Sequence, residues 1–209
     1  MDWRDTPATV ALVALTTIVS AVLLLFGGDQ AVVAGGFIPA HVSRVVTPEQ
    51  LGPVPVFLTP LTATLLHGGW LHLLFNMVML GFCGRETERA LGWANVLLLY
   101  LLGAYAAATG QWLQDSSSLA PMIGASGAIS ALVASYSLLY GRHRARALGP
   151  VPAWIVQAVW LGAAWTGINL MLGFTNAMGQ PIAIGAHIGG FVVGLLLARP
   201  LLQWRYRRA

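Results

Sequence analysis

The chain has 209 residues, of which 57% are hydrophobic and only 9% are charged. Soluble domains carry about 25% charged residues, so the composition excludes an ordinary soluble enzyme and predicts that most of the surface faces lipid. The only cysteine is Cys83, which excludes an internal disulfide. All 11 basic residues are arginines and the net charge is +4, so binding to nucleic acid has to be weighed against a membrane location.

Apolar segments long enough to cross a membrane recur evenly along the chain. A helix needs about 20 residues to cross the hydrocarbon layer. The even spread predicts one membrane domain over residues 1–209, with an all-α integral membrane fold built as a bundle of six transmembrane helices. The predicted spans are residues 8–26, 61–82, 93–113, 122–140, 154–174 and 182–198.

The first apolar segment, residues 8–26, is longer than the core of a secretory signal, which has about 7–15 residues. No small-x-small cleavage site follows it at once, so we expect it to be retained as the first span. Residues 27–60 then place apolar side chains among prolines and glycines. That composition indicates a loop that lies partly in the membrane interface.

The second segment carries three polar side chains, His67, His72 and Asn76. Polar groups inside a bilayer are costly and suggest function by default. His72 and Asn76 are four residues apart and share a helix face, so an imidazole and an amide aimed at one point would suit an oxyanion hole. A metal site is the alternative, and the absence of an H-E-x-x-H pattern or a nearby acidic residue disfavours it.

The fourth segment opens with Gly124-Ala125-Ser126-Gly127. Gly124 and Gly127 leave the Ser126 side chain and backbone accessible, and Ser126 is the fifth residue of its predicted span. The positive end of the helix therefore lies near Ser126 and would stabilise a developing oxyanion. The alternative is a small packing serine that is hydrogen-bonded back to a carbonyl.

Polar residues also occur in the last two segments. In the fifth we expect Gln157, Thr166 and Asn169 to form inter-helix hydrogen bonds. In the sixth, His187 is surrounded by glycines and lies six residues into the span, so at about 1.5 Å per residue it reaches nearly the depth of Ser126. His187 could then act as a general base for Ser126; a histidine bonded to a carbonyl and a proton-relay residue are the alternatives.

The arginines predict the orientation. With six spans, both termini and the loops at 83–92 and 141–153 share one side, and only Arg44 lies on the other. By the positive-inside rule both termini are cytoplasmic, and the basic face is a topology signal and a contact for anionic lipid rather than for nucleic acid. The arginines on the cytoplasmic side are Arg4, Arg85, Arg89, Arg142, Arg144, Arg146, Arg199, Arg205, Arg207 and Arg208.

Taken together, these motifs resemble the rhomboid family of intramembrane serine proteases. They occur in the family's order on the second, fourth and sixth segments, so the resemblance covers roughly residues 8–200. The matching strings are His67-Gly68-Gly69-Trp70-Leu71-His72 with Asn76, Gly84-Arg85-Glu86-Thr87-Glu88-Arg89, Gly124-Ala125-Ser126-Gly127, and Ala186-His187-Ile188-Gly189-Gly190.

The resemblance implies a rhomboid-like bundle with a Ser126–His187 dyad and no acidic partner. It implies that His72, Asn76 and the Ser126 backbone N–H form the oxyanion hole, and that His67 and Gly124 line the site. Three family features are missing. The first outer loop has no Trp-Arg pair, Ser130 stands where some members have a tyrosine that stacks on the histidine, and Ala183-Ile184 stand where members often have Asp-Asn.

The sequence thus predicts an intramembrane serine endopeptidase that cleaves single-span membrane proteins in or near the outer half of the bilayer. The expected partners are transmembrane protein substrates and membrane lipid, with no nucleic acid, no cofactor and no metal. The expected location is a multi-pass position in the bacterial inner membrane. The alternatives are a non-catalytic rhomboid-like protein that binds membrane clients and a small transporter, for which no inverted repeat is visible.

Overall fold

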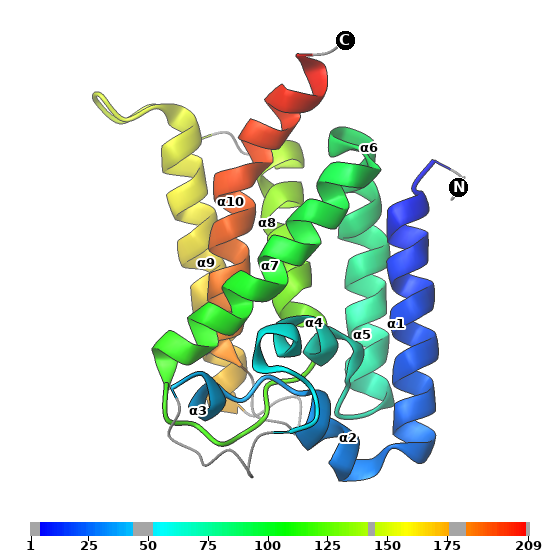
Figure 1. Cartoon of the computed structure of the whole chain (residues 1–209). Helices are drawn as coiled ribbons and strands as arrows, with labels where there is room; N and C mark the ends of the chain where they lie inside the picture. The colour runs from blue at the N-terminus through cyan, green and yellow to red at the C-terminus, as the bar shows by residue number, and fades with distance from the viewer. Residues whose placement is uncertain (1–4, 44–51, 142–144, 176–182, 208–209) are drawn as a thin grey trace.

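The computed structural model describes residues 5–43, 52–141, 145–175 and 183–207. This part of the chain is helical, with two isolated β-bridges. In Figure 1 the helices α1, α5, α8, α9 and α10 lie nearly parallel and α7 crosses them obliquely. Their bounds are α1 Pro7–Phe26, α5 Trp70–Met79, α7 Trp93–Gln114, α8 Ser126–Tyr140, α9 Ala153–Thr175 and α10 Ile184–Tyr206.

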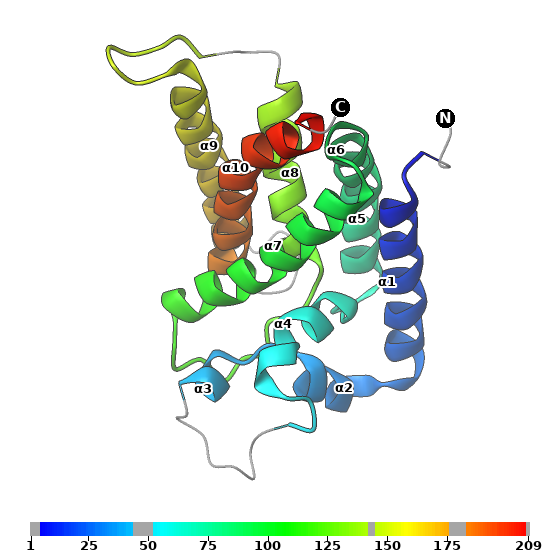
Figure 2. The same cartoon turned by 45° about the horizontal axis from the view of Figure 1, so that its top comes forward.

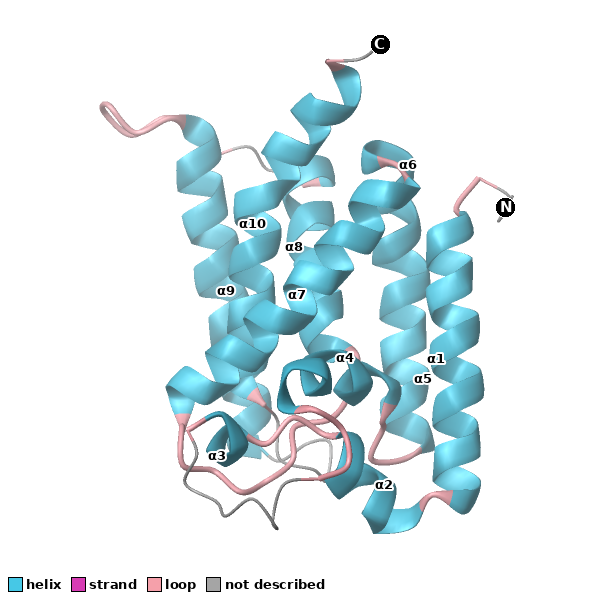
Figure 3. Ribbon diagram, in the orientation of Figure 1, coloured by secondary structure: helices cyan, strands magenta, loops and turns pink. Residues whose placement is uncertain are grey.

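Shorter elements connect these helices and lie mainly toward the end of the bundle where the pink loops gather (Figure 3). They are α2 Gly28–Gly35, α3 Pro39–Val42, α4 Thr59–Thr62, α6 Arg85–Leu91, 3₁₀ turns at Val56–Leu58 and Ala63–Leu65, and a π turn at Leu80–Gly84.

Three helices of the described chain are long and apolar enough to cross a membrane: α1, α7 and α10. A bent pair, Val56–Leu65 with Trp70–Leu91, passes the same test when it is counted as one span, which makes up to four spans by length and composition. α8 is a shorter apolar helix of 15 residues. The count of six spans therefore stays a prediction.

The prediction of one continuous second span over residues 61–82 was wrong. The chain instead forms α4 and a 3₁₀ turn, breaks at residues 66–69, and resumes as α5 at Trp70, with a bend of 92° between the two parts. Gly69 has φ +153°, a backbone conformation that other residues rarely adopt. Because of this break α4 lies across the bundle rather than along it (Figure 2), and His67 sits in a loop rather than on a helix.

The other predicted spans match the helices in place but not at every end. α1, α7 and α9 lie within one residue of the predictions 8–26, 93–113 and 154–174 at each end. α10 runs on to Tyr206, well past 198, with Pro200 inside it. α8 starts at Ser126 rather than 122, because Met122 pairs with Phe37 through two backbone hydrogen bonds of 2.8 and 3.0 Å.

The loop after α1, predicted to be the first outer loop, is anchored without a Trp-Arg pair. The Ser43 hydroxyl donates to the Ser116 carbonyl at 2.7 Å and accepts from the Trp112 indole N–H at 2.8 Å. The Ala40 N–H donates to the Ser118 carbonyl at 3.0 Å. These bonds and the Phe37–Met122 bridge tie the loop to the segment that leads into α8, so the loop helps to place Ser126. Arg44 lies outside the described residues.

A buried carboxylate closes the opposite end of the bundle. Glu88 on α6 accepts from the Ala8 N–H at 3.0 Å, the Thr9 N–H at 2.7 Å and the Thr9 hydroxyl at 2.6 Å. The two N–H groups are in the first turn of α1, where backbone donors have no partner within the helix. The helix dipole also favours a negative charge there. The start of α1 and the end of α10 lie at this same end (Figure 1).

The core lies between α7, α8 and α10. Fully buried side chains such as Leu99 and Leu132 fill it, and small residues line the closest approaches. At Gly190 on α10 an added Cβ would overlap the Gly127 carbonyl of α8. Small residues allow helices in a bilayer to pack backbone against backbone, and this contact sets how near α10 can bring its first turn to α8.

Candidate active site

The structure brings Ser126 and His187 into contact across 61 positions of sequence. The His187 Nε2 atom lies 2.7 Å from the Ser126 Oγ atom. Ser126 is the first residue of α8 and His187 is in the first turn of α10. Both side chains are half-buried, and an imidazole nitrogen at this distance can take a proton from the hydroxyl.

Close helix packing accounts for this contact. Gly127 of α8 packs against Ala107 and Ala186, where an added Cβ would lie 2.5 Å and 3.7 Å from their Cβ atoms. The start of α10 is further held by the Gln114 side chain, whose Oε1 accepts from the Gly185 N–H at 2.6 Å. The depth match expected from the sequence is therefore realised by three helices, α7, α8 and α10.

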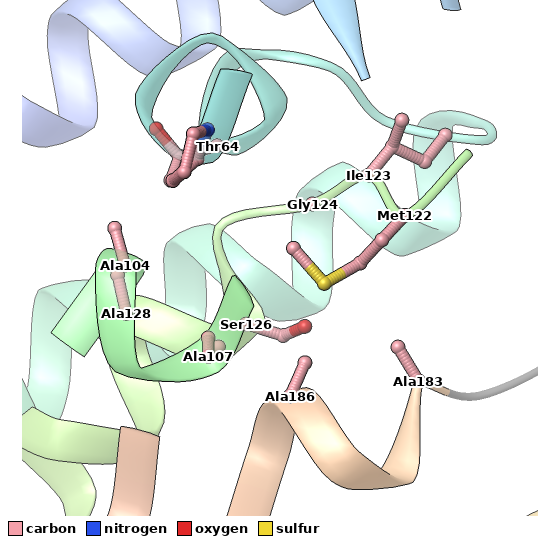
Figure 4. A pocket seen from close by; sticks show the side chains of 12 residues that line it. Thr64, Ala104, Ala107, Met122, Ile123, Gly124, Ser126, Ala128, Ala183 and Ala186 are labelled. Atoms are coloured by element: carbon pink, nitrogen blue, oxygen red, sulfur yellow. The ribbon is translucent and has the colours of Figure 1, made fainter. Parts of the chain in front are cut away.

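A small hollow opens beside the Ser126 hydroxyl. Figure 4 shows Ser126 at the start of α8, with Ala186 of α10 and Ala183, which directly precedes α10, on one side and Met122 on another. Thr64 and Ala104 line the far wall. Most of the lining side chains are small or apolar, and the Ser126 hydroxyl is one of the few polar groups among them.

Gly124 allows a second imidazole to approach the hydroxyl. Its φ is +111°, which strains any other residue, and an added Cβ would lie 2.8 Å from the His72 Nε2 atom and 3.7 Å from the Ser126 Oγ atom. The Gly124 N–H donates to the Ala63 carbonyl at 2.9 Å, which fixes this turn against the 3₁₀ segment. His72 therefore belongs to the same site as Ser126.

The tautomer of His72 follows from its other nitrogen. The Gly68 N–H donates to the His72 Nδ1 atom at 3.2 Å, so Nδ1 is an acceptor. A neutral imidazole has one N–H, and in His72 it must be on Nε2, which faces Gly124. This gives the site a fixed hydrogen-bond donor.

Asn76 lies one turn further along α5 and is buried. Its Nδ2 donates to the His72 carbonyl at 2.8 Å, and its Oδ1 has no hydrogen-bond partner in the described part of the chain. One N–H of the amide is thus used within the helix and the other remains for a ligand. His72 approaches the turn before Ser126 closely at Gly124. Asn76 has no comparable contact with this turn among the described residues.

His67 stands behind His72 rather than beside Ser126. The Ser20 hydroxyl donates to the Leu65 carbonyl at 2.8 Å and lies 2.9 Å from the His67 Nδ1 atom. The His67 and His72 rings meet edge to face with centroids 5.0 Å apart. His67 therefore ties α1 to the loop before α5 and supports the His72 ring.

One residue in contact with the dyad was not predicted as part of the site. Asn169 on α9 lies with its Oδ1 atom 2.5 Å from the His187 Nδ1 atom, and it is 3% exposed. The sequence predicts an inter-helix hydrogen bond at Asn169, but not one to the candidate base. A comparison of the two residues' positions along their helices would have suggested this contact. Asn169 lies about 9 Å before the end of α9, and His187 lies about 5 Å after the start of α10.

Comparisons with known proteins indicate the family of the chain. The profile of the Rhomboid domain matches residues 56–204. A rhomboid protease GlpG from Photorhabdus laumondii is 31% identical over 137 residues, which cover 66% of this chain and 45% of that protein. A rhomboid protease GlpG from Yersinia pestis is 27% identical over 192 residues, which cover 92% of this chain and 62% of that protein.

The chain thus spans roughly half to three-fifths of the length of these relatives. The matched domain covers most of the chain and includes α5, α8 and α10, on which Ser126, His187 and His72 lie. On this evidence the chain belongs to the rhomboid family.

Proposed function

We propose that this protein is an intramembrane serine endopeptidase that cleaves single-span membrane proteins with a Ser126–His187 dyad. The observation that carries the proposal is the 2.7 Å contact between the Ser126 Oγ and His187 Nε2 atoms. Nucleophilic catalysis by serine needs an adjacent base. The similarity to two rhomboid proteases supports the same reaction class.

The first half of the reaction forms an ester. Ser126 Oγ attacks the carbonyl carbon of the scissile peptide bond while its proton passes to His187 Nε2, which gives a tetrahedral intermediate with a negatively charged oxygen. The intermediate collapses, the C–N bond breaks, and His187 gives the proton to the leaving amine. In the second half water attacks the ester with the same help from His187, and the carboxylic acid product leaves.

The charged oxygen of the intermediate would be stabilised by three hydrogen-bond donors. The Ser126 N–H lies at the start of α8, where the helix dipole favours negative charge. The His72 Nε2–H faces Gly124, which is two residues before Ser126. The second N–H of Asn76 would add a third donor. We assign His67 to the support of His72.

The test of this function uses the whole protein in lipid vesicles with a fluorescent single-span test substrate. We expect cleavage that a fluorophosphonate stops and a metal chelator does not, with the adduct located on Ser126 by mass spectrometry of peptides. Substrate that binds without being cut would contradict the proposal and favour a client-binding protein. Transport of a solute without proteolysis would favour a transporter.

We also propose that both termini are cytoplasmic, in a bacterial inner membrane, with the site opening outward. Two observations support this proposal. The sequence places ten of the eleven arginines on one side of the six predicted spans, and the start of α1 and the end of α10 lie at the same end of the bundle (Figure 1). Arg4, Arg142, Arg144 and Arg208 lie outside the described residues.

Cysteine labelling tests this orientation after Cys83→Ser. A cysteine at Asp115, which follows α7 beside the site, should react with an impermeant maleimide in intact cells. A cysteine at Arg146, in the loop between α8 and α9, should react only after lysis. The reverse pattern would invert the proposed orientation and with it the side on which the product is released.

A further inference from the structure

We propose that Asn169 is a positioning residue that holds His187 in the tautomer and orientation that the reaction needs. This inference rests on the proposed function, because it assigns the partner of the candidate base. The geometry that points to it is the contact between the Asn169 side-chain oxygen and the His187 Nδ1 atom. The site then works as a Ser–His–Asn series on α8, α10 and α9.

The orientation of the Asn169 amide is fixed by its second contact. Asn169 Nδ2 lies 2.9 Å from the Trp165 carbonyl oxygen, one turn earlier in α9. A carbonyl oxygen only accepts, so the NH₂ end of the amide must face Trp165. The oxygen end of Asn169 therefore faces His187, and it too can only accept a hydrogen bond.

This acceptor selects one form of the neutral imidazole. With an acceptor on its Nδ1 side, His187 carries its single proton on Nδ1 and leaves the lone pair of Nε2 free. That lone pair is directed at the Ser126 hydroxyl, 2.7 Å away. The other tautomer would place an N–H against the Ser126 hydroxyl, so His187 could not take the serine proton. It would also leave the buried Asn169 oxygen without a hydrogen-bond donor.

The surroundings hold Asn169 and His187 together. The Trp165 indole N–H donates to the His187 carbonyl at 3.4 Å, and the Trp165 ring stacks on Phe191 of α10 with centroids 5.0 Å apart. Both contacts join α9 to α10 within a turn of the dyad. Ser130, the residue one turn after Ser126, does not orient His187, because its hydroxyl donates to the Ser126 carbonyl at 2.8 Å.

The experiment compares Asn169→Leu, which removes the acceptor at similar size, with Asn169→Asp, which keeps it. Ile168→Ala is the matched control, because Ile168 directly precedes Asn169 in α9 and is 48% exposed. For Asn169→Leu we expect kcat to fall by about tenfold or more and KM to stay within about twofold. Asn169→Asp should recover most of the lost kcat, and Ile168→Ala should match the unaltered protein.

A second readout does not depend on catalysis. In protein labelled with ¹⁵N-histidine and kept alkaline, the His187 resonances should report a proton on Nδ1, and Asn169→Leu should move the proton toward Nε2. An unchanged tautomer in Asn169→Leu, or equal kcat in the Leu and Asp variants, would overturn the proposal. Asn169→Ala gives the same readouts if the leucine variant does not fold.

The two proposals fail in different ways. If Ser126 and His187 do not catalyse proteolysis, Ser126→Ala keeps its activity whatever happens at position 169. If only the role of Asn169 is wrong, Ser126→Ala is inactive while Asn169→Leu keeps both the activity and the Nδ1 tautomer of the unaltered protein.

Discussion

Ser126→Ala should reduce cleavage of a single-span substrate to background, a loss of about 10⁵-fold or more in kcat. The substitution removes the only hydroxyl in contact with His187 Nε2 in the described part of the chain, and the chain then has no nucleophile at the start of α8. Substrate binding should persist, because the hydroxyl gains most of its interaction energy after the reaction has begun. The measurement is turnover in vesicles together with binding to labelled substrate.

Ser130→Ala is the matched control for this variant. It removes a hydroxyl from the same helix one turn later, where the side chain is buried and bonded to the Ser126 carbonyl. We expect a loss of no more than about tenfold, the value of one neutral hydrogen bond. If Ser126→Ala keeps substantial turnover, or if both variants lose activity equally while remaining folded, Ser126 is not the nucleophile.

Three helix starts converge on the candidate site. His72 is in the first turn of α5, Ser126 begins α8, and His187 is in the first turn of α10. Unpaired N–H groups give each helix start a partial positive charge. An oxyanion formed between them would therefore be favoured by the backbone as well as by side chains, in a chain with no acidic residue in any of the six predicted spans.

The spacing of motifs on apolar segments was enough to predict that Ser126 and His187 approach each other. The prediction succeeded because the rise per residue is fixed in a helix, so position along a span translates into depth. It did not reveal the break before α5, because hydropathy over residues 61–82 is continuous and only Gly68-Gly69 marks the interruption.

Contacts between helices were harder to predict than depth. The sequence places Asn169 on the fifth span but does not say which way that helix is rotated, and rotation decides whether its amide meets His187 or a carbonyl. The same limit applies to Asn76, whose amide the sequence directs toward the site while the structure shows one of its N–H groups bonded to the His72 carbonyl.

His72→Ala should lower kcat by about 10²–10³-fold, the loss seen when a hydrolase loses one oxyanion donor. The Gly68 N–H fixes the proton of His72 on Nε2, and Gly124 lets that nitrogen approach the reaction centre. KM should change little, since this bond strengthens only as the oxyanion forms. Asn76→Ala should have a smaller effect than His72→Ala, because one N–H of Asn76 is already used within α5.

His41→Ala is the control for the loss of an imidazole, because His41 lies on α3 and not on α5, α8 or α10, the helices that carry His72, Ser126 and His187. Its kcat should match that of the unaltered protein, and all three variants should show similar thermal unfolding midpoints. A larger loss in Asn76→Ala than in His72→Ala would show that the amide is the main donor. A rise in KM with unchanged kcat in His72→Ala would instead place His72 in substrate binding, because uniform binding affects KM alone.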